Sequence, residues 1–495
     1  MDCNKDYFCI EKNQKVFSKN IDIEEDFSQS LPAYCDDILR VVKCVSHFSL
    51  GSVCISQGEV MINGKCTMAL TYYNENSSLC YADFEEDYSK SIAVDNLTDY
   101  AFAAAEISDK YTNFRVINQR RIDIHSSACI SLSVYDKASC PCLKSCEGAK
   151  LKKETVKSAD IIASNISKIE FDEEFSLPAD NSAIGRIISS CVTANLTETK
   201  IIKDKVLVKA EVTANILYTD SDNNTISRVS NTFNISKIIE QSGIDENDII
   251  ICKTDIASAF HKAKTGSGDK LCVVEIFGEV SVNSTFIREN ENEIVTDAYM
   301  IKYNNKCDSS DYNTLSDILH INESKMFSLE LELPNGVNEI QEISVNLTAP
   351  QIRNAKLVSK AQTTVIYVNE SGALTSASLT NDIAIDASGR ENAVSSLSVK
   401  TADYNIADSK RVNLRLGVDI NSYLYNNKVY KVISNIDMID GKDSAPSLTL
   451  YFAKANENVW EIAKSFSSDT DLILSENELG SEKLSDDKIL IIPRV

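Results

Sequence analysis

Apolar and polar residues alternate along several long stretches of this chain. In the clearest stretch one face holds Val206, Val208, Ala210, Val212, Ala214, Ile216 and Tyr218, and the other holds Lys209, Glu211, Thr213 and Asn215. Alternation with a period of two over this length predicts a half-buried strand of an antiparallel sheet. Similar apolar periods occur at 122–134, 272–282 and 412–420. We therefore expect a mainly β fold built from β-sandwich or barrel-like units.

The pattern repeats about every 150 residues. A Leu-Pro step occurs at Leu31, Leu177 and Leu333, which are 146 and 156 residues apart. After each step comes a strand that ends in a tyrosine and a polar turn; these tyrosines are Tyr72, Tyr218 and Tyr367. Short helices are predicted between the step and this strand, at 37–42 and 183–188, with a weaker equivalent at 337–343. Self-similarity at a fixed period indicates three copies of one structural unit.

Polar segments divide the chain into four predicted domains. The predicted linkers are 137–157, 304–324 and 440–446, and the last contains Gly441 and Pro446. Gly and Pro suit a boundary that few contacts cross. The predicted domains are three repeated units at 1–140, 148–303 and 315–440, followed by a small module at 447–495.

Composition narrows the class of protein. The chain has 495 residues, so several domains are expected, and its net charge of −23 argues against nucleic acid and anionic membrane as partners. No apolar run approaches the roughly 20 residues of a membrane helix, and the first residues do not resemble an export signal. We therefore expect a cytoplasmic protein with no membrane insertion. In that compartment the 15 cysteines should stay reduced, many as small buried apolar residues.

The last 48 residues show a different, partly helical pattern. Val459, Ile462, Ala463 and Phe466 have the spacing of one helix face, with Glu457 or Asn458 as its cap. A second helix is predicted to start near Ser468-Asp469 and to bury Leu472 and Ile473. A β-rich run at 489–492 ends at Pro493. The predicted order is therefore strand, helix, helix, strand, which is a small α+β module.

This C-terminal segment resembles a LysM module, a fold best known for binding N-acetylglucosamine polymers. Together with the Leu-Pro steps, the tyrosine-turn strands and the 150-residue repeat, it gives the chain a resemblance to the SPOCS/LysM proteins of spore-forming clostridia. The resemblance implies a non-enzymatic protein of spore-coat assembly in the mother-cell cytosol. It also implies that the LysM module binds a protein, the coat-assembly ATPase at the forespore surface.

The module departs from the usual LysM sequence where sugar-binding members form their groove. Asn456-Glu457-Asn458 stands in place of Gly-Asp-Thr, while Asn477 of the second loop is kept and Leu479 follows it. With a module charge of −4, a protein partner, peptidoglycan and a purely structural role all stay open. The candidate binding residues are Leu448, Asn456, Glu457, Asn458, Trp460, Asn477 and Leu479. Trp460 is either a packing residue or an interface anchor, and Leu448 either a core contact or part of an apolar patch.

The remaining chemistry-bearing residues form no catalytic pattern in the sequence. The thiols of Cys140, Cys142 and Cys146 are close together and could bind zinc, take part in redox chemistry or simply lie in a linker. The histidines form no HExxH motif, and neither a nucleophile elbow nor a phosphate-binding loop is visible. We expect no cofactor and no metal, and a hydrolase hidden in the repeats is the weakest of the three functions considered.

Overall fold

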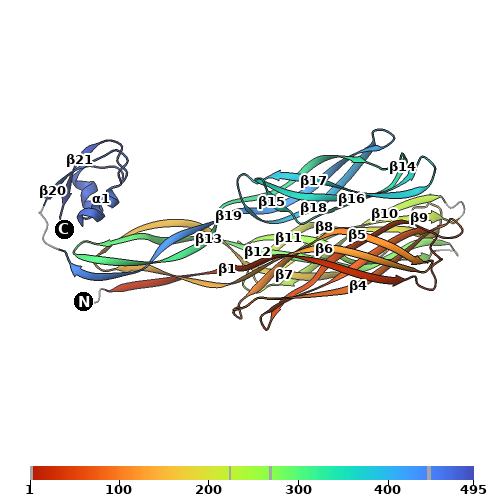
Figure 1. The fold of residues 1–495 in the computed structure, drawn as a ribbon, viewed down its shortest axis with the longest axis horizontal. Coiled ribbons are helices and arrows are strands. Elements are labelled where there is room, and N and C mark those ends of the chain that lie inside the picture. Colours follow the sequence, from red (N-terminus) through yellow and green to blue (C-terminus); the bar gives the residue numbers. More distant parts are fainter. Residues whose placement is uncertain (1–3, 222–224, 267–269, 443–447, 495) are drawn as a thin grey trace.

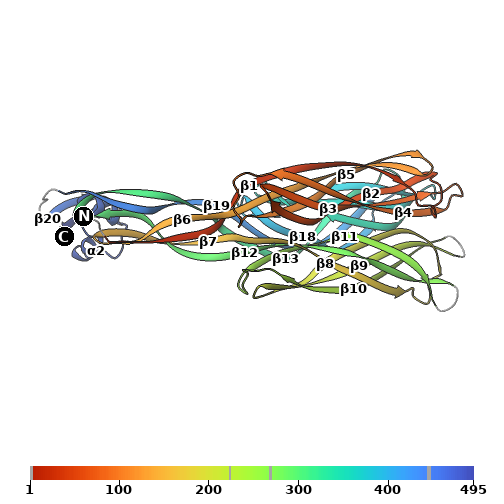
Figure 2. The ribbon, with the colours of Figure 1, turned by 90° about the horizontal axis from the view of Figure 1, so that it is seen from below.

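The computed structural model describes residues 4–221, 225–266, 270–442 and 448–494. Figure 1 shows three regions along the long axis. A broad head of β-sheets narrows into a stalk of long strands, and a small helical module lies at the tip of the stalk. The N-terminus lies at the same end as this module. The two views agree that the head contains most of the strands (Figures 1 and 2).

The first unit consists of two antiparallel sheets. Its strands are β1 (Lys5–Ser30), β2 (Arg40–Ser56), β3 (Glu59–Tyr73), β4 (Leu79–Ala93), β5 (Phe102–Asn118) and β6 (Arg121–Cys146). One sheet has the order β1-β6-β5 and the other has the order β2-β3-β4. A single apolar core, which includes Ile62, Leu70 and Ile130, receives residues from both sheets. The unit is therefore a β-sandwich.

The same pairing pattern recurs twice more. The second unit contains β7 (Ala149–Ser176), β8 (Ile184–Ile202), β9 (Lys205–Asp220), β10 (Ile226–Glu240), β11 (Ile249–Thr265) and β12 (Leu271–Met300). The third contains β13 (Tyr303–Glu332), β14 (Val337–Leu347), β15 (Gln351–Arg353), β16 (Lys356–Asn369), β17 (Leu374–Asp386), β18 (Asn392–Ile406) and β19 (Arg411–Gly441). In each unit the first strand pairs with the last, and the last also pairs with the strand before it. The predicted mainly β class and its repeated sandwich units are confirmed.

Strand alternation in the sequence gives the buried faces correctly. On β9 all seven residues of the predicted apolar face, from Val206 to Tyr218, are buried. Tyr72 and Tyr367, at the ends of β3 and β16, are buried as well. The hydroxyl of Tyr72 donates a hydrogen bond to the carbonyl of Asp36, at 2.8 Å. These tyrosines are thus packing residues, and Tyr72 also fixes the loop before β2.

The predicted short helices are wrong. Residues 40–42 and 184–188 lie at the starts of β2 and β8, and 337–343 lies in β14. Ile188 is buried in a cluster with Leu217 and Ile366, and Val42 packs against it. This cluster joins residues of all three units. The apolar residues that suggested a helix face are therefore buried by neighbouring units.

Two predicted linkers are also strands, because the stalk is built from them. Residues 137–157 belong to β6 and β7, apart from a turn between the strands, and 304–324 lies in β13. The third predicted linker begins with the last two residues of β19 and Lys442, and its residues 443–446 lie outside the described part of the chain. Three antiparallel strand pairs, β1/β6, β7/β12 and β13/β19, form the stalk. Its core holds Ile10, Val156, Ile294, Tyr312 and Val432.

The cysteine cluster belongs to this stalk core. Cys140 and Cys142 pack with Ile10 and Val156, and Cys146 lies in the adjoining cluster with Leu143. Burial raises the pKa of the Cys142 thiol to about 12, which keeps it protonated at neutral pH. Over the described residues no group of His, Cys, Asp and Glu could hold a metal ion. These thiols act as small core residues.

Candidate functional site

The C-terminal module has the predicted order of elements. It consists of β20 (Leu448–Ala453), α1 (Val459–Phe466), α2 (Thr470–Glu476) and β21 (Lys488–Pro493), with β20 and β21 antiparallel. Asn458 caps α1, since its side chain accepts a hydrogen bond from the backbone N–H of Trp460 at 2.8 Å. Asp469 caps α2 in the same way through Asp471. The capping residues suggested by the sequence thus start both helices.

The core of the module explains most of the predicted apolar stripe. Val459, Ile462, Ala463 and Ile473 are buried together with Leu490 of β21. Two predicted core residues are exceptions, because Phe466 and Leu472 are 38% and 37% exposed. Phe466 ends α1 next to Ser467, whose left-handed φ of 55° turns the chain away, and its ring rests on Tyr451. Leu472 is not among the buried residues of α2, which are Thr470 and Ile473.

The module packs on the stalk tip through the first turn of α1. The ring of Trp460 meets Tyr299 edge-on, with 5.0 Å between ring centroids. Its indole N–H donates to Asp297 Oδ2 at 2.8 Å, and the amine of Lys464 donates to Asp297 at 2.7 Å. Burial would raise the pKa of Asp297, but the hydrogen bonds from Lys464 and Trp460 outweigh it and the pKa is lowered. Asp297 is therefore the charged anchor of this contact.

Further contacts surround the turn between the helices. The hydroxyl of Tyr299 donates to the carbonyl of Ser468 at 2.8 Å, and Lys150 pairs with Asp469 at 2.6 Å. The amine of Lys442 donates to the hydroxyl of Ser467 at 2.6 Å. Trp460 is consequently only 5% exposed. The structure places this predicted binding residue inside a contact within the chain, which sequence spacing did not reveal.

The loop at Asn456-Glu457-Asn458 is tied to the segment before β21. The N–H of Asn456 donates to the carbonyl of Leu484 at 2.9 Å, and the N–H of Leu484 donates to the carbonyl of Glu457 at 3.0 Å. The N–H of Val459 donates to the carbonyl of Glu482 at 2.8 Å. The backbone donor of Asn456 and that of Val459, the first residue of α1, are therefore used within the module. A ligand that needed these N–H groups would have to displace the 482–484 segment.

Asn477 and Leu479 support the module from inside. The side chain of Asn477 donates to the carbonyls of Ile473 and Ile491 at 2.8 and 2.7 Å, and accepts from the N–H of Ile491 at 2.7 Å. It thus joins the end of α2 to β21. Leu479 is partly buried against the module core. The geometry gives both residues a structural role.

The outward side of the two-stranded sheet is apolar and exposed. Leu448, Leu450 and Phe452 are 54%, 61% and 75% exposed, and they lie opposite Pro493, Ile491 and Ile489 of β21. We call these six residues the outer face. Of the predicted site residues, only Leu448 belongs to it. The signal in the sequence was the run 489–492, which is apolar at every position and therefore cannot have one polar side.

A known family matches part of the second unit. Residues 183–263 match the family described as SipL, SPOCS domain. The chain contains a SPOCS domain. This SPOCS domain comprises β8 to β11, so it covers most of the second unit and leaves out the first and third units and the C-terminal module. No curated protein and no solved structure matches the chain.

The SPOCS domain suggests a role in spore-coat morphogenesis. Its central strand β9 is the one whose alternating pattern opened the sequence analysis, and β8, β9 and β10 form its sheet. Among the described residues no helix is long and apolar enough to cross a membrane.

Proposed function

We propose that this chain is a non-enzymatic scaffold of endospore-coat assembly whose C-terminal module binds a protein, the coat-assembly ATPase at the forespore surface. In this proposal the three units correspond to the SPOCS-like domains predicted at 1–140, 148–303 and 315–440, and residues 447–495 form a LysM-type module. The SPOCS domain at 183–263 supports a role in endospore-coat assembly. The observation that carries the binding role is the outer face, which is apolar, exposed and located at the tip of the stalk.

The architecture suits adhesion better than chemistry. The stalk holds the module away from the head, and the contact of Trp460 and Lys464 with Asp297 fixes its orientation. Because this contact uses α1 and the turn after it, the opposite sheet stays open for a partner. The head offers separate surfaces to other coat proteins or to further copies. Several binding surfaces on one chain raise the effective concentration, so weak contacts can give firm assembly.

Peptidoglycan is the alternative ligand, and the loop geometry argues against it. A sugar polymer would need backbone donors in the loop at 456–458, yet the N–H groups of Asn456 and Val459 already bond to 482–484. The module also carries more acidic than basic residues. An uncharged apolar surface is a poor match for a sugar but a good match for a protein surface, where apolar contacts form the centre of most interfaces.

The test exposes the full-length chain to two baits in parallel, the purified coat ATPase and insoluble peptidoglycan. We expect retention on the ATPase alone. A chain truncated after Lys442 should keep the circular-dichroism signature and melting behaviour of the three units but lose ATPase binding. Retention on peptidoglycan alone would overturn the proposal in favour of a cortex-binding protein. ATPase binding by the truncated chain would move the binding site to the three units.

A further inference from the structure

The three units enclose a cavity of about 490 Å³. Its walls come from β2 and β5 of the first unit, β8 and β11 of the second, and β14, β16 and β18 of the third. Hydrogen bonds around the cavity join residues of different units. The Gln362 side chain donates to the carbonyl of Asp109 at 2.9 Å, and the N–H of Ala349 donates to the hydroxyl of Ser108 at 2.6 Å. The cavity is therefore one of the places where the units are joined.

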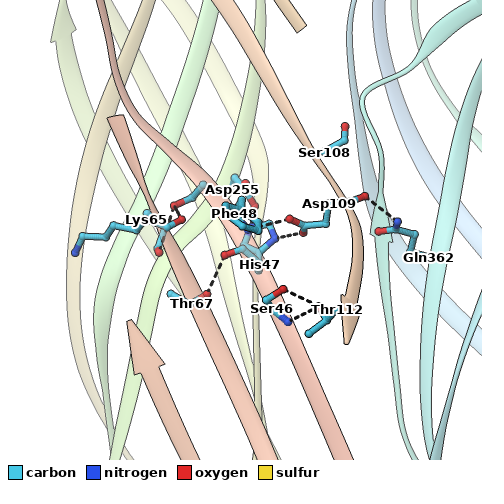
Figure 3. A network of polar contacts seen from close by, with 12 residues as sticks. Ser46, His47, Phe48, Lys65, Thr67, Ser108, Asp109, Thr112, Asp255 and Gln362 are labelled. Carbon is cyan, nitrogen blue, oxygen red and sulfur yellow. Dashed lines mark hydrogen bonds and ion pairs between the residues drawn. The ribbon is translucent and has the colours of Figure 1, made fainter. Parts of the chain in front are cut away.

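His47 is the histidine of this wall that touches two carboxylates. Its Nδ1 lies 2.6 Å from Asp109 Oδ2, and its Nε2 lies 3.0 Å from Asp255 Oδ1. Figure 3 shows the imidazole between the two acids. His47 and Asp109 lie on β2 and β5 of the first unit, whereas Asp255 lies on β11 of the second. The side chain of His47 thus bridges two units that the sequence separates by 208 residues.

The geometry requires both ring nitrogens to carry a proton. An ionised carboxylate can only accept hydrogen bonds, and a neutral imidazole has only one N–H to donate. Burial would lower the pKa of His47, but Asp255 and Asp109 outweigh this effect and raise it well above its ordinary value. Burial would likewise raise the pKa of Asp255, but His47 outweighs it and the pKa is lowered. The pair of carboxylates and the imidazolium therefore stabilise one another.

Two lysines of the wall have partners of their own, and burial raises the pKa of Asp83 on β4, which also lines the cavity. Lys43 on β2 pairs with Glu342 of β14 at 2.9 Å, and Lys110 on β5 pairs with Asp22 at 2.6 Å. Lys253 on β11 acts on Asp255 and lowers its pKa further. The second oxygen of Asp109 accepts from the N–H of Phe48 at 2.9 Å, which fixes that carboxylate beside the ring. The two acids are thus the charged groups that hold His47.

We propose that His47 is a pH-sensitive clasp between the first and second units, closed while its imidazolium bridges Asp109 and Asp255 and open once the proton is lost. Its side chain lines the cavity and is 28% exposed, so water can exchange the proton. A histidine whose pKa is raised in the folded state stabilises that state. The stabilisation is complete at pH values below the unfolded-state pKa of about 6.5. That contribution disappears as pH rises through the higher folded value. Alkaline conditions therefore loosen the joint, whereas neutral conditions keep it closed.

The test uses nitrogen NMR of the full-length chain labelled with ¹⁵N-histidine. The chain has four histidines, so single substitutions to Gln assign each signal. We expect both ring nitrogens of His47 to be protonated at pH 7 and its titration midpoint to lie on the alkaline side of neutrality. Asp255→Asn should lower that midpoint by about one pKa unit or more, a tenfold or larger loss of proton affinity. A neutral His47 ring at pH 7 would overturn the clasp.

The exposed pair of His125 with Asp26, 2.7 Å apart, provides the matched control. Asp26→Asn should leave the His47 midpoint unchanged. A shift of His47 as large in Asp26→Asn as in Asp255→Asn would show that global charge sets the midpoint, and would refute the clasp. Hydrogen exchange of wild-type chain gives a readout without any variant. After correction for intrinsic rates, amides of β11 should lose protection above the His47 midpoint, and unchanged protection would contradict the proposal.

Discussion

The ion pair between Lys43 and Glu342 should be the most sensitive joint between the first and third units. The amine and carboxylate are 2.9 Å apart, and their side chains are only 8% and 6% exposed. Burial would lower the pKa of Lys43, but Glu342 outweighs this effect and raises it. Lys43→Met keeps most of the length of the side chain and leaves the carboxylate buried without its cation. Breaking a buried pair in this way costs about 3–5 kcal/mol.

The double variant Lys43→Met/Glu342→Met separates pairing from packing. Because two apolar side chains need no partner, it should return to within about 1 kcal/mol of the wild type. A chain of several units does not unfold in one step, so the free energy is best read from hydrogen exchange of amides in β2 and β14. The exposed pair of Lys209 with Glu198 is the control, and Lys209→Met should cost less than about 1 kcal/mol. A double variant as unstable as Lys43→Met would refute the reasoning.

Three further predictions concern packing and the module. Gly278→Ala should lower the free energy of unfolding by about 1–3 kcal/mol, measured as a lower melting temperature. The reason is that the added carbon would lie 2.1 Å from the carbonyl oxygen of Ser258. Gly441→Ala, with nothing within 4 Å, should be neutral. Trp460→Phe removes the hydrogen bond from the indole N–H to a carboxylate, so the amides of α1 should lose about 1.5–3 kcal/mol of protection in hydrogen exchange. Unchanged protection would show that this hydrogen bond contributes nothing. Asn477→Ala removes three hydrogen bonds, so the module should unfold before the three units do. Its unfolding should appear as an early change in the fluorescence of the single tryptophan. A single unfolding transition shared by the module and the units would contradict this prediction.

Local periodicity in the sequence was sufficient to predict the buried faces of strands, but it did not predict which other units cover them. The alternation on β9 specifies which side is buried whatever the neighbours are, so that prediction was confirmed. The segment around Ile188 misled because its apolar residues are covered by other units, and no local pattern contains that information. The segment from 137 to 157 misled for the same reason. Its cysteines and Val156 become a core only when three antiparallel strand pairs meet.

The same limit applies to the candidate sites. The capping roles of Asn458 and Asp469 are local, so the sequence contained them. The contact of Trp460 with Tyr299 joins residues 161 positions apart, and the bridge from His47 to Asp255 spans 208. Only a folded chain brings such residues together. The outer face was within reach of sequence analysis, because β21 is apolar on both sides.

The central claim is that the module binds the coat ATPase through its outer face. The most direct test measures the dissociation constant of full-length chain for the purified ATPase, with Phe452→Glu as the outer-face variant and Asn456→Ala as the loop variant. Phe452 is 75% exposed, so the charge should not disturb folding, which thermal melting would verify. We predict that Phe452→Glu weakens binding about 30-fold or more, equivalent to about 2 kcal/mol, while Asn456→Ala changes it less than about threefold. Unchanged affinity in Phe452→Glu together with loss of binding in Asn456→Ala would contradict the account.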